Sequence, residues 1–231
     1  MNHGGDQFEQ QYRSILAQLP RHVQLVAVSK TKPVEDIRAL YELGQRDFGE
    51  NYVQELVDKQ AQLPADLRWH FIGHLQSNKV KYIAGFVHLI HGVDSLKLLK
   101  EIHKQAAKLD RVIDCLLQVH IAREETKFGL DEAELARAMS EIAATPQEFS
   151  HVKVRGLMGM ASFTEDKDQV RGEFHTLKAL FDKYFTAASP SSAPPSSRGL
   201  LSMGMSADYA IAVEEGSNMV RIGSLLFGKR D

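Results

Sequence analysis

Lys30 is the residue whose setting in this sequence most favours covalent chemistry. It follows an apolar, β-branched run (23–29, VQLVAVS) and precedes Pro33. A lysine just beyond the carboxyl end of a buried strand has its methylene groups packed among apolar residues and its amine in a cavity. In such a setting the pKa of a lysine can fall, and the free amine can form a Schiff base with a carbonyl compound. The alternative for Lys30 taken alone is a solvated surface charge, which is what most lysines are.

Two glycine–serine motifs near the carboxyl terminus point to a phosphate ligand. The segment 203–206 (MGMS) is expected to open a helix, and Gly223 and Ser224 directly follow the last predicted strand. Glycine lets backbone amides approach an anion, and a helix amino terminus with a hydroxyl group binds phosphate readily. Each motif taken alone is equally well explained as a tight turn with an N-cap serine.

Arg221 lies within the last predicted strand, where an unpaired charge is costly to bury. A purely structural role would be an ion pair with Glu50 or Asp208. A functional role would be a hydrogen-bond donor to a ligand heteroatom. An imine-forming lysine, a phosphate cradle and an arginine that face the same cavity together indicate pyridoxal 5'-phosphate (PLP) as the ligand.

The hydrophobic periodicity predicts eight strands that alternate with helices. The strands are predicted at 23–29, 47–50, 67–73, 87–93, 112–121, 152–158, 199–203 and 218–222, and the helices at 6–18, 34–43, 53–61, 74–83, 96–106, 131–144, 166–185 and 206–215. This alternation indicates an α/β fold of parallel βαβ units, which closes most simply into a single (β/α)8 TIM barrel over residues 1–231. An open doubly wound sheet is the alternative, although no strand is followed by a glycine-rich nucleotide-binding fingerprint.

A barrel would bring the polar strand ends together at one rim, where barrel enzymes have their sites. Polar residues and glycines do concentrate where the predicted strands end, at 49–52, 73–76, 123–129, 156–160, 202–206 and 221–224. The strands between these ends are apolar. Together the segments predict a lined pocket with Lys30 at its mouth.

Composition narrows the cellular setting and the class of partner. The formal net charge of −2 gives no electrostatic case for nucleic acid or an acidic membrane. One cysteine, Cys115, excludes an internal disulfide, and no apolar run is long enough for a signal peptide or a membrane span. We expect a cytoplasmic protein. The segment 187–198 (AASPSSAPPSSR) has the composition of a flexible Ser/Pro-rich loop.

Six motifs together resemble the pyridoxal-phosphate homeostasis proteins, the YggS family. They are AVSKTKP, FGENYVQE, WHFIGHLQSNK, GLMGM, LSMGMSADY and VRIGSLLFGKRD, and the likeness runs from about Val23 to Asp231. The resemblance implies a single barrel similar to the amino-terminal domain of alanine racemase, which is fold type III among PLP proteins. It also implies a covalent aldimine between PLP and Lys30, with Arg221 facing the pyridine nitrogen.

The resemblance further implies which residues contact the cofactor. Ser206, Gly223 and Ser224 would surround the phosphate, Asn51 would line the pocket, and His74 and Met203 would lie near the ring. The full set of implied cofactor-binding residues is Lys30, Asn51, His74, Met203, Ser206, Arg221, Gly223 and Ser224. No catalytic residue and no metal ligand is predicted.

An arginine opposite the pyridine nitrogen favours carriage of PLP over catalysis. Because arginine stays charged and can only donate, the nitrogen stays unprotonated and the ring stabilises a carbanion weakly. Racemisation also needs acid–base groups on both faces of the substrate, and Lys30 could serve one face only. In alanine racemase the second group is a tyrosine from outside this barrel, whereas Tyr52, Tyr82 and Tyr209 do not match that position.

We therefore expect a non-catalytic or barely catalytic protein that holds PLP as a Schiff base and buffers or delivers it. The alternatives are a PLP-dependent amino-acid racemase and a class I aldolase-type barrel whose lysine attacks the substrate. Lys127 is the competing lysine, since its loop is predicted on the same rim. The expected partners are PLP and, transiently, PLP-dependent apo-enzymes. A monomer is expected, because the domain through which the racemases contact their partner subunit has no counterpart in this sequence.

Overall fold

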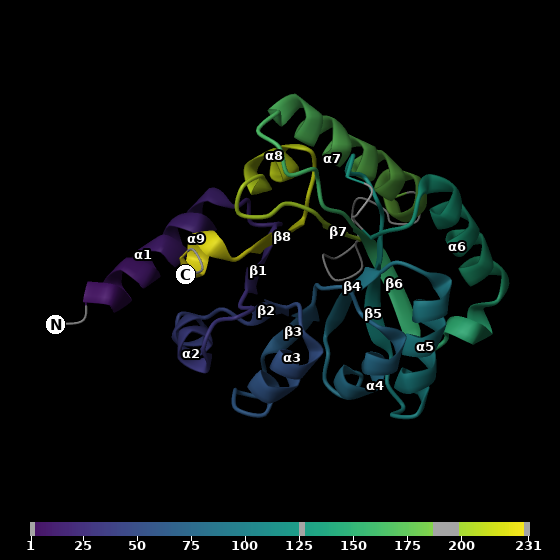
Figure 1. The fold of residues 1–231 in the computed structure, drawn as a ribbon, viewed down its shortest axis with the longest axis horizontal. Helices are drawn as coiled ribbons and strands as arrows, with labels where there is room; N and C mark the ends of the chain where they lie inside the picture. The colour runs from purple at the N-terminus through teal and green to yellow at the C-terminus, as the bar shows by residue number, and fades with distance from the viewer. Residues whose placement is uncertain (1–2, 125–127, 187–198, 229–231) are drawn as a thin grey trace.

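Eight parallel strands form a closed barrel in the order β1 to β8, and the helices lie around its outside (Figure 1). The computed structural model describes residues 3–124, 128–186 and 199–228. The strands are β1 (Gln24–Val28), β2 (Asp47–Glu50), β3 (Arg68–Phe71), β4 (Leu89–Val93), β5 (Ile113–Gln118), β6 (Val152–Met158), β7 (Leu200–Ser202) and β8 (Met219–Ile222). The pairing of β8 with β1 closes the sheet, which confirms the predicted barrel and excludes the open sheet.

Helices follow the strands in sequence and cover the barrel. They are α1 (His3–Gln18), α2 (Val34–Glu42), α3 (Val53–Gln60), α4 (Val80–Ile83), α5 (Leu96–Ala107), α6 (Glu132–Ala144), α7 (Lys167–Phe181), α8 (Tyr209–Glu214) and α9 (Ser224–Phe227). Helix α5 begins at Ser95, whose hydroxyl accepts from the Leu98 amide at 3.2 Å, as a capping serine should. Helix α6 begins with a capping box between Asp131 and Glu134.

Two predicted helices are shorter than the sequence pattern indicated. The segment predicted as a helix from 74 to 83 contains a 3₁₀ turn (Ser77–Lys79) followed by the single turn of α4, whose buried side chains are Val80 and Ile83. The segment 206–215 becomes helical only at Tyr209. The Asp208 carboxylate accepts from the Met205 amide at 2.6 Å, and this contact folds the preceding residues into a turn.

Buried apolar side chains form two separate regions. The larger region lies between the strands and the helices, and includes Phe48, Leu99 and Phe174. The smaller region contains Val26, Leu89, Leu116, Met158 and Met219. Val26 is paired in register with Arg221 of β8, so both side chains share the inner face of the sheet. The barrel interior is thus filled partly by apolar and partly by polar side chains.

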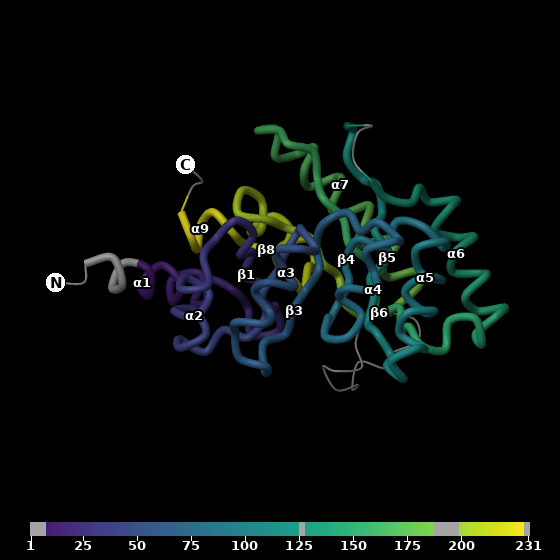
Figure 2. Tube along the Cα trace, turned by 60° about the horizontal axis from the view of Figure 1, so that its bottom comes forward, coloured from purple at the N-terminus to yellow at the C-terminus, as the bar shows by residue number. Residues whose placement is uncertain are grey.

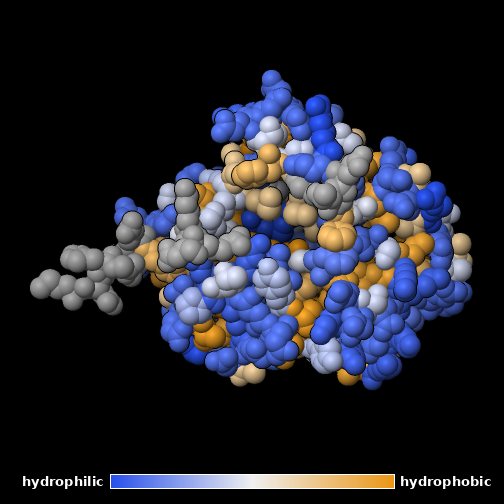
Figure 3. Space-filling model, in the orientation of Figure 1, coloured by the Kyte–Doolittle hydropathy of each residue, from blue (hydrophilic) through white to orange (hydrophobic). Residues whose placement is uncertain are grey.

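The first and last helices lie side by side, as both ribbon and tube views show (Figures 1 and 2). Phe8 of α1 and Phe227 of α9 contact each other with ring centroids 5.8 Å apart. The face drawn in Figure 3 is mostly hydrophilic, with hydrophobic residues in small groups. Within the described ranges, no helix has the length and apolarity to cross a membrane. The predicted loop at 187–198 lies outside the described residues.

Candidate functional site

A cavity of about 1050 Å³ lies at the carboxyl-terminal rim of the barrel, and we call it the rim cavity. Six of the eight residues predicted from the sequence line it: Lys30, Asn51, Ser206, Arg221, Gly223 and Ser224. These residues come from the ends of β1, β2, β7 and β8 or from the loops that follow them. Parallel strands all end at the same rim, so closure of the barrel brings together residues that are up to 194 positions apart.

Lys30 lies two residues beyond the end of β1 and is held by contacts to the residues on either side of it. The Ser29 hydroxyl donates to Glu50 Oε1 at 2.6 Å, and the Ser29 carbonyl accepts from Lys59 Nζ at 2.7 Å. On the other side, the Thr31 amide donates to Glu55 Oε1 at 2.6 Å. Thr31 has φ of +62°, a left-handed conformation that costs energy for a threonine. The loop that carries Lys30 is therefore fixed by its surroundings.

Lys59, Glu50 and Glu55 form the cluster that holds this loop. Lys59 Nζ lies 2.8 Å from Glu50 Oε1 and 2.6 Å from Glu55 Oε1, and the Glu50 side chain is fully buried. Burial raises the pKa of Glu50, while the hydrogen bonds from Lys59 and Ser29 act in the opposite direction. The second oxygen of Glu50, Oε2, is buried and has no hydrogen-bond partner within the described part of the chain. Removal of one charge from this cluster would therefore be costly, because the buried charges that remain could not be solvated by water.

Arg221 is buried and lines the rim cavity. Its Nη1 donates to the Ser202 hydroxyl at 2.6 Å and its Nη2 to the Gly159 carbonyl at 3.1 Å. Burial lowers the pKa of Arg221 to about 10, and the charge of Asp208 opposes this shift. The guanidinium therefore keeps its proton at neutral pH and can only donate. Of the two ion-pair partners considered from the sequence, Glu50 pairs with Lys59 instead.

Ser206 and Gly223 lie on the cavity wall, and the Ser206 hydroxyl meets two backbone amides that follow β8. The Ser206 hydroxyl oxygen accepts from the Gly223 amide at 3.3 Å and from the Leu225 amide at 3.4 Å. A Cβ atom at Gly223 would lie 3.2 Å from the Val28 carbonyl oxygen, so glycine allows the backbone here to pack closely against the end of β1. Ser206 is not the start of α8, contrary to the sequence prediction, and it reaches the site through the amides after β8.

Asn51 has a buried hydrogen-bond acceptor to which a ligand could donate. Its side chain lines the rim cavity, and its Oδ1 is buried with no hydrogen-bond partner among residues 3–124, 128–186 and 199–228. A buried acceptor without a partner is costly, and such atoms often mark a place where a ligand or water binds. The wall therefore offers an amine, a guanidinium, hydroxyl groups, backbone amides and one unsatisfied acceptor, and this set fits PLP.

His74 and Met203 are not among the residues that line the rim cavity. The His74 side chain is 41% exposed, hydrogen-bonds to Asp94 and stacks on Phe128 with ring centroids 4.0 Å apart. Met203 is fully buried in the apolar region between strands and helices. The competing Lys127 lies outside the described residues.

Several residues of the cavity wall were missed by the sequence reasoning. One group of them, from Ala161 to Glu165, belongs to the loop after β6. Phe163 in this loop is 94% exposed, and Ser162 is held by Glu173 through bonds of 2.6 and 2.7 Å. Lys32 also lines the cavity, and its Nζ donates to the Phe227 carbonyl at 3.0 Å. Lys32 could have been predicted from the sequence as a lining residue, because it is the second lysine of the motif AVSKTKP.

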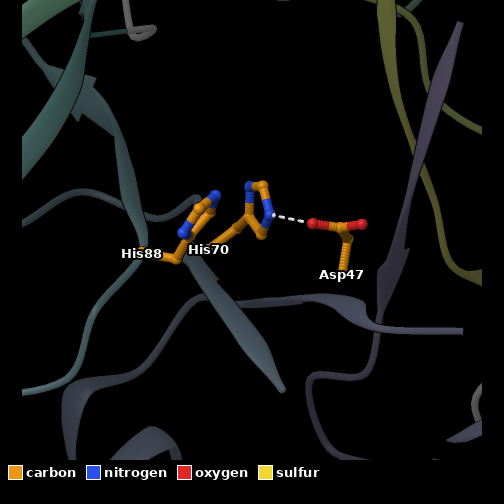
Figure 4. Close-up of side chains that lie close together, drawn as sticks. All are labelled: Asp47, His70 and His88. Atoms are coloured by element: carbon orange, nitrogen blue, oxygen red, sulfur yellow. Dashed lines mark hydrogen bonds and ion pairs between the residues drawn. The ribbon is translucent and has the colours of Figure 1, made fainter. Parts of the chain in front are cut away.

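Asp47, His70 and His88 lie close together at the other end of the barrel (Figure 4). Their possible metal-ligand atoms are within 4.8 Å of one another. However, Arg68 donates to both oxygens of Asp47, at 2.8 and 2.6 Å. Both ring nitrogens of His70 are also in hydrogen bonds. Because these groups are already engaged, and a guanidinium repels a cation, we assign no metal here.

Comparison with known proteins relates this chain to a family. The family model described as the alanine racemase N-terminal domain matches residues 5–231. The pyridoxal phosphate homeostasis protein of Aquifex aeolicus is 43% identical over 211 residues, covering 90% of this chain and 87% of the relative. That of Pasteurella multocida is 40% identical over 212 residues, with coverage of 90% and 87%.

Solved structures show the same similarity. PipY of Synechococcus elongatus, solved with PLP bound, has a TM-score of 0.82 at 37% identity, covering 96% of this chain and 100% of PipY. Alanine racemase of Bartonella henselae has a TM-score of 0.70 at 17% identity, covering 98% of this chain and 61% of the racemase. The likeness to the racemase concerns the fold alone.

Proposed function

The chain belongs to the family of pyridoxal phosphate homeostasis proteins, and we propose that its rim cavity holds PLP on Lys30 for buffering and delivery. The observation that carries this proposal is the meeting of Lys30, Arg221 and Ser206 on the wall of one cavity. An amine suits the aldehyde of PLP, a guanidinium suits its ring nitrogen, and a hydroxyl beside backbone amides suits its phosphate.

Each residue has a separate part in this proposal. Lys30 binds the aldehyde carbon as a reversible Schiff base, and an incoming amine can later exchange with it. Ser206, Gly223 and Ser224 bind the phosphate. Asn51 gains a partner for its buried oxygen. The cluster around Lys59 keeps the Lys30 loop in place, so the amine does not have to be ordered when PLP binds.

Arg221 keeps the bound cofactor poorly reactive. A carboxylate opposite the ring nitrogen would hold a proton there and make the ring a strong electron sink. Arg221 contacts a hydroxyl and a carbonyl and has only N–H donors to offer the ring. The nitrogen therefore stays unprotonated, and abstraction of a proton from a bound amino acid is disfavoured. This property suits a carrier of PLP.

The racemase alternative lacks a tyrosine at the described wall of the rim cavity to act as the second acid–base group. Racemisation needs a proton donor on the face of the substrate opposite Lys30. Within the described residues, the cavity wall contains no tyrosine, and the side chains of Tyr52 and Tyr82 are 58% and 51% exposed. Incubation of the PLP-loaded protein with single-enantiomer amino acids should give no turnover at ordinary enzyme rates. Such turnover, followed by chiral chromatography, would favour the racemase.

We further propose that the protein acts as a cytoplasmic monomer that passes PLP to apo-enzymes by transient contact. The direct experiment is to mix the loaded protein with a PLP-dependent apo-enzyme and follow recovery of that enzyme's activity. Recovery faster than with the same concentration of free PLP supports direct delivery. Recovery at the rate set by spontaneous PLP release leaves buffering as the function. Sedimentation at the working concentration reports the oligomeric state.

A further inference from the structure

A chain of hydrogen bonds crosses the barrel interior from Arg221 to the opposite end. Arg221 Nη1 donates to Ser202 Oγ at 2.6 Å, and Ser202 Oγ lies 3.0 Å from His91 Nδ1. His91 Nε2 lies 3.0 Å from His70 Nδ1, and His70 Nε2 lies 2.9 Å from Asp47 Oδ1. The chain thus joins β8, β7, β4, β3 and β2.

All members of this chain are withdrawn from solvent. Ser202, His91 and His70 are fully buried, Arg221 is 3% exposed and Asp47 is 5% exposed. Water cannot replace a lost bond at such positions, so each donor and acceptor depends on its neighbour in the chain. The Asp47 end is anchored by Arg68, which donates to both carboxylate oxygens.

The positions of the available hydrogen atoms indicate which group donates in each bond of this hydrogen-bond chain. Ser202 accepts from Arg221, so its single hydroxyl hydrogen is available to His91 Nδ1. Burial, together with the neighbouring charge of Arg221, holds the pKa of His91 well below its ordinary value, so its ring is neutral. A neutral ring that accepts at Nδ1 carries its hydrogen on Nε2 and donates to His70.

The same reasoning continues to the carboxylate. If His70 accepts from His91 at Nδ1, its hydrogen lies on Nε2, which then donates to Asp47 Oδ1 across the contact drawn as a dashed line in Figure 4. Every bond in the chain then has one donor and one acceptor, and the chain ends on a negative charge. In the reverse direction a His70 ring with its hydrogen on Nδ1 would turn a bare nitrogen toward the carboxylate, which is unfavourable.

We propose that Asp47, His70 and His91 are positioning residues that act through Ser202 to fix the Arg221 guanidinium beneath the bound cofactor. The proposal rests on the PLP-binding function inferred above. The chain makes the Ser202 oxygen an acceptor toward Arg221, and so sets where the remaining guanidinium N–H groups point. The end of the barrel remote from the rim cavity thereby affects how firmly the ring nitrogen is bound.

The experiment compares three variants in the PLP-loaded protein. His91→Leu removes the imidazole ring at the middle of the hydrogen-bond chain. His91→Asn supplies an amide oxygen that can accept from Ser202 in place of the imidazole nitrogen. His88→Gln is the matched control, because the His88 ring lies 5.4 Å from that of His70 but takes no part in the chain. The readouts are the visible absorption and circular dichroism of bound PLP, and the rate at which PLP is released on dilution.

If the hydrogen-bond chain positions Arg221, His91→Leu should release PLP about tenfold faster than wild type, which corresponds to the loss of about one buried hydrogen bond. It should also shift the visible band, while His91→Asn recovers part of both effects and His88→Gln keeps wild-type values. Wild-type spectra and release rates in His91→Leu, even with a lower melting temperature, would overturn the proposal and leave a structural role only.

Two further results keep the interpretation clear. If His91→Leu does not fold, Ser202→Ala removes the acceptor next to Arg221 with a smaller loss of volume, and the same outcomes apply. If wild-type protein itself carries no PLP on Lys30, the proposed function fails. If wild type is loaded and the variants match it, only the positioning role fails.

Discussion

Lys59 Nζ donates to the carbonyl oxygen of Ser29 at 2.7 Å, one residue before Lys30. Lys59 also pairs with Glu50 and Glu55, and Glu55 in turn accepts from the Thr31 amide. The backbone on both sides of Lys30 is therefore bound by one buried ionic cluster. The precision of the Lys30 position depends on side chains that never touch the rim cavity.

Lys59→Met is expected to destabilise the protein by about 3 kcal/mol, because it leaves Glu50 buried without its cation. It should also weaken PLP binding, since the Lys30 loop loses its anchor. Denaturant unfolding and PLP titration measure the two effects. Lys100→Met is the control, because Lys100 pairs with Glu141 and Glu148 at the surface, and little change is expected there. Equal effects of the two variants would contradict the role given to Lys59.

Asp47→Asn is expected to change how stability depends on pH. Burial alone would raise the pKa of Asp47, but the hydrogen bonds from Arg68 and His70 and the charge of Arg68 outweigh burial and hold it well below its ordinary value. The folded protein thus gains stability from the ionised carboxylate above the unfolded pKa of about 4, and loses it as the pH falls below that value.

The free energy of unfolding of Asp47→Asn should accordingly be about 2–3 kcal/mol lower than that of wild type at neutral pH. The difference should shrink as the pH falls below about 4. Urea unfolding at a series of pH values measures both. A difference that stays constant from neutral to acid pH would show that the Asp47 charge is not what stabilises the fold.

Ser206→Ala tests the phosphate cradle. The variant removes the hydroxyl that meets the Gly223 and Leu225 amides. We expect about tenfold weaker binding of PLP and unchanged binding of pyridoxal, which lacks the phosphate. Ser150→Ala, far along the chain in a surface turn, serves as the control. Equal weakening of PLP and pyridoxal would remove Ser206 from the phosphate site.

Gly156→Ala tests the close approach of β6 and β7. A Cβ atom at Gly156 would lie 1.9 Å from the Leu200 carbonyl oxygen, so the two strands would have to separate. We expect a loss of about 3 kcal/mol in the free energy of unfolding. Gly172→Ala, within α7 and with open space around its Cβ position, should instead raise stability by about 0.5–1 kcal/mol. A tolerated Gly156→Ala would contradict this packing.

The strands and the central lysine could be predicted from the sequence because their signals are local. The segment 152–158 was predicted with the bounds that the structure gives, and Lys30 stands out by the apolar run before it. Closure of the barrel follows from the number of alternating units. The short helices α4 and α8 were overestimated, because neighbouring turns imitate helical spacing without burying a helical face.

The chain of hydrogen bonds from Arg221 to Asp47 could not be predicted, because it joins residues from distant segments. Asp47 and Ser202 are 155 positions apart, and only the closed sheet places them in one chain of hydrogen bonds. A buried histidine such as His91 has no local pattern that distinguishes it from a surface histidine. His74 was included by resemblance, and its stacking on Phe128 outside the cavity wall could not be read from the motif.

The most direct test of the central claim is to find which lysine carries PLP. The purified protein is loaded with PLP, its visible spectrum is recorded, and the Schiff base is reduced with borohydride before peptide mapping. Lys30→Ala and Lys32→Ala are measured in parallel, since both lysines line the rim cavity. We expect the label on Lys30 in wild type and in Lys32→Ala, and no visible Schiff-base band in Lys30→Ala. A Lys30→Ala protein that keeps the full band, or a label on another lysine of wild type, would contradict the account.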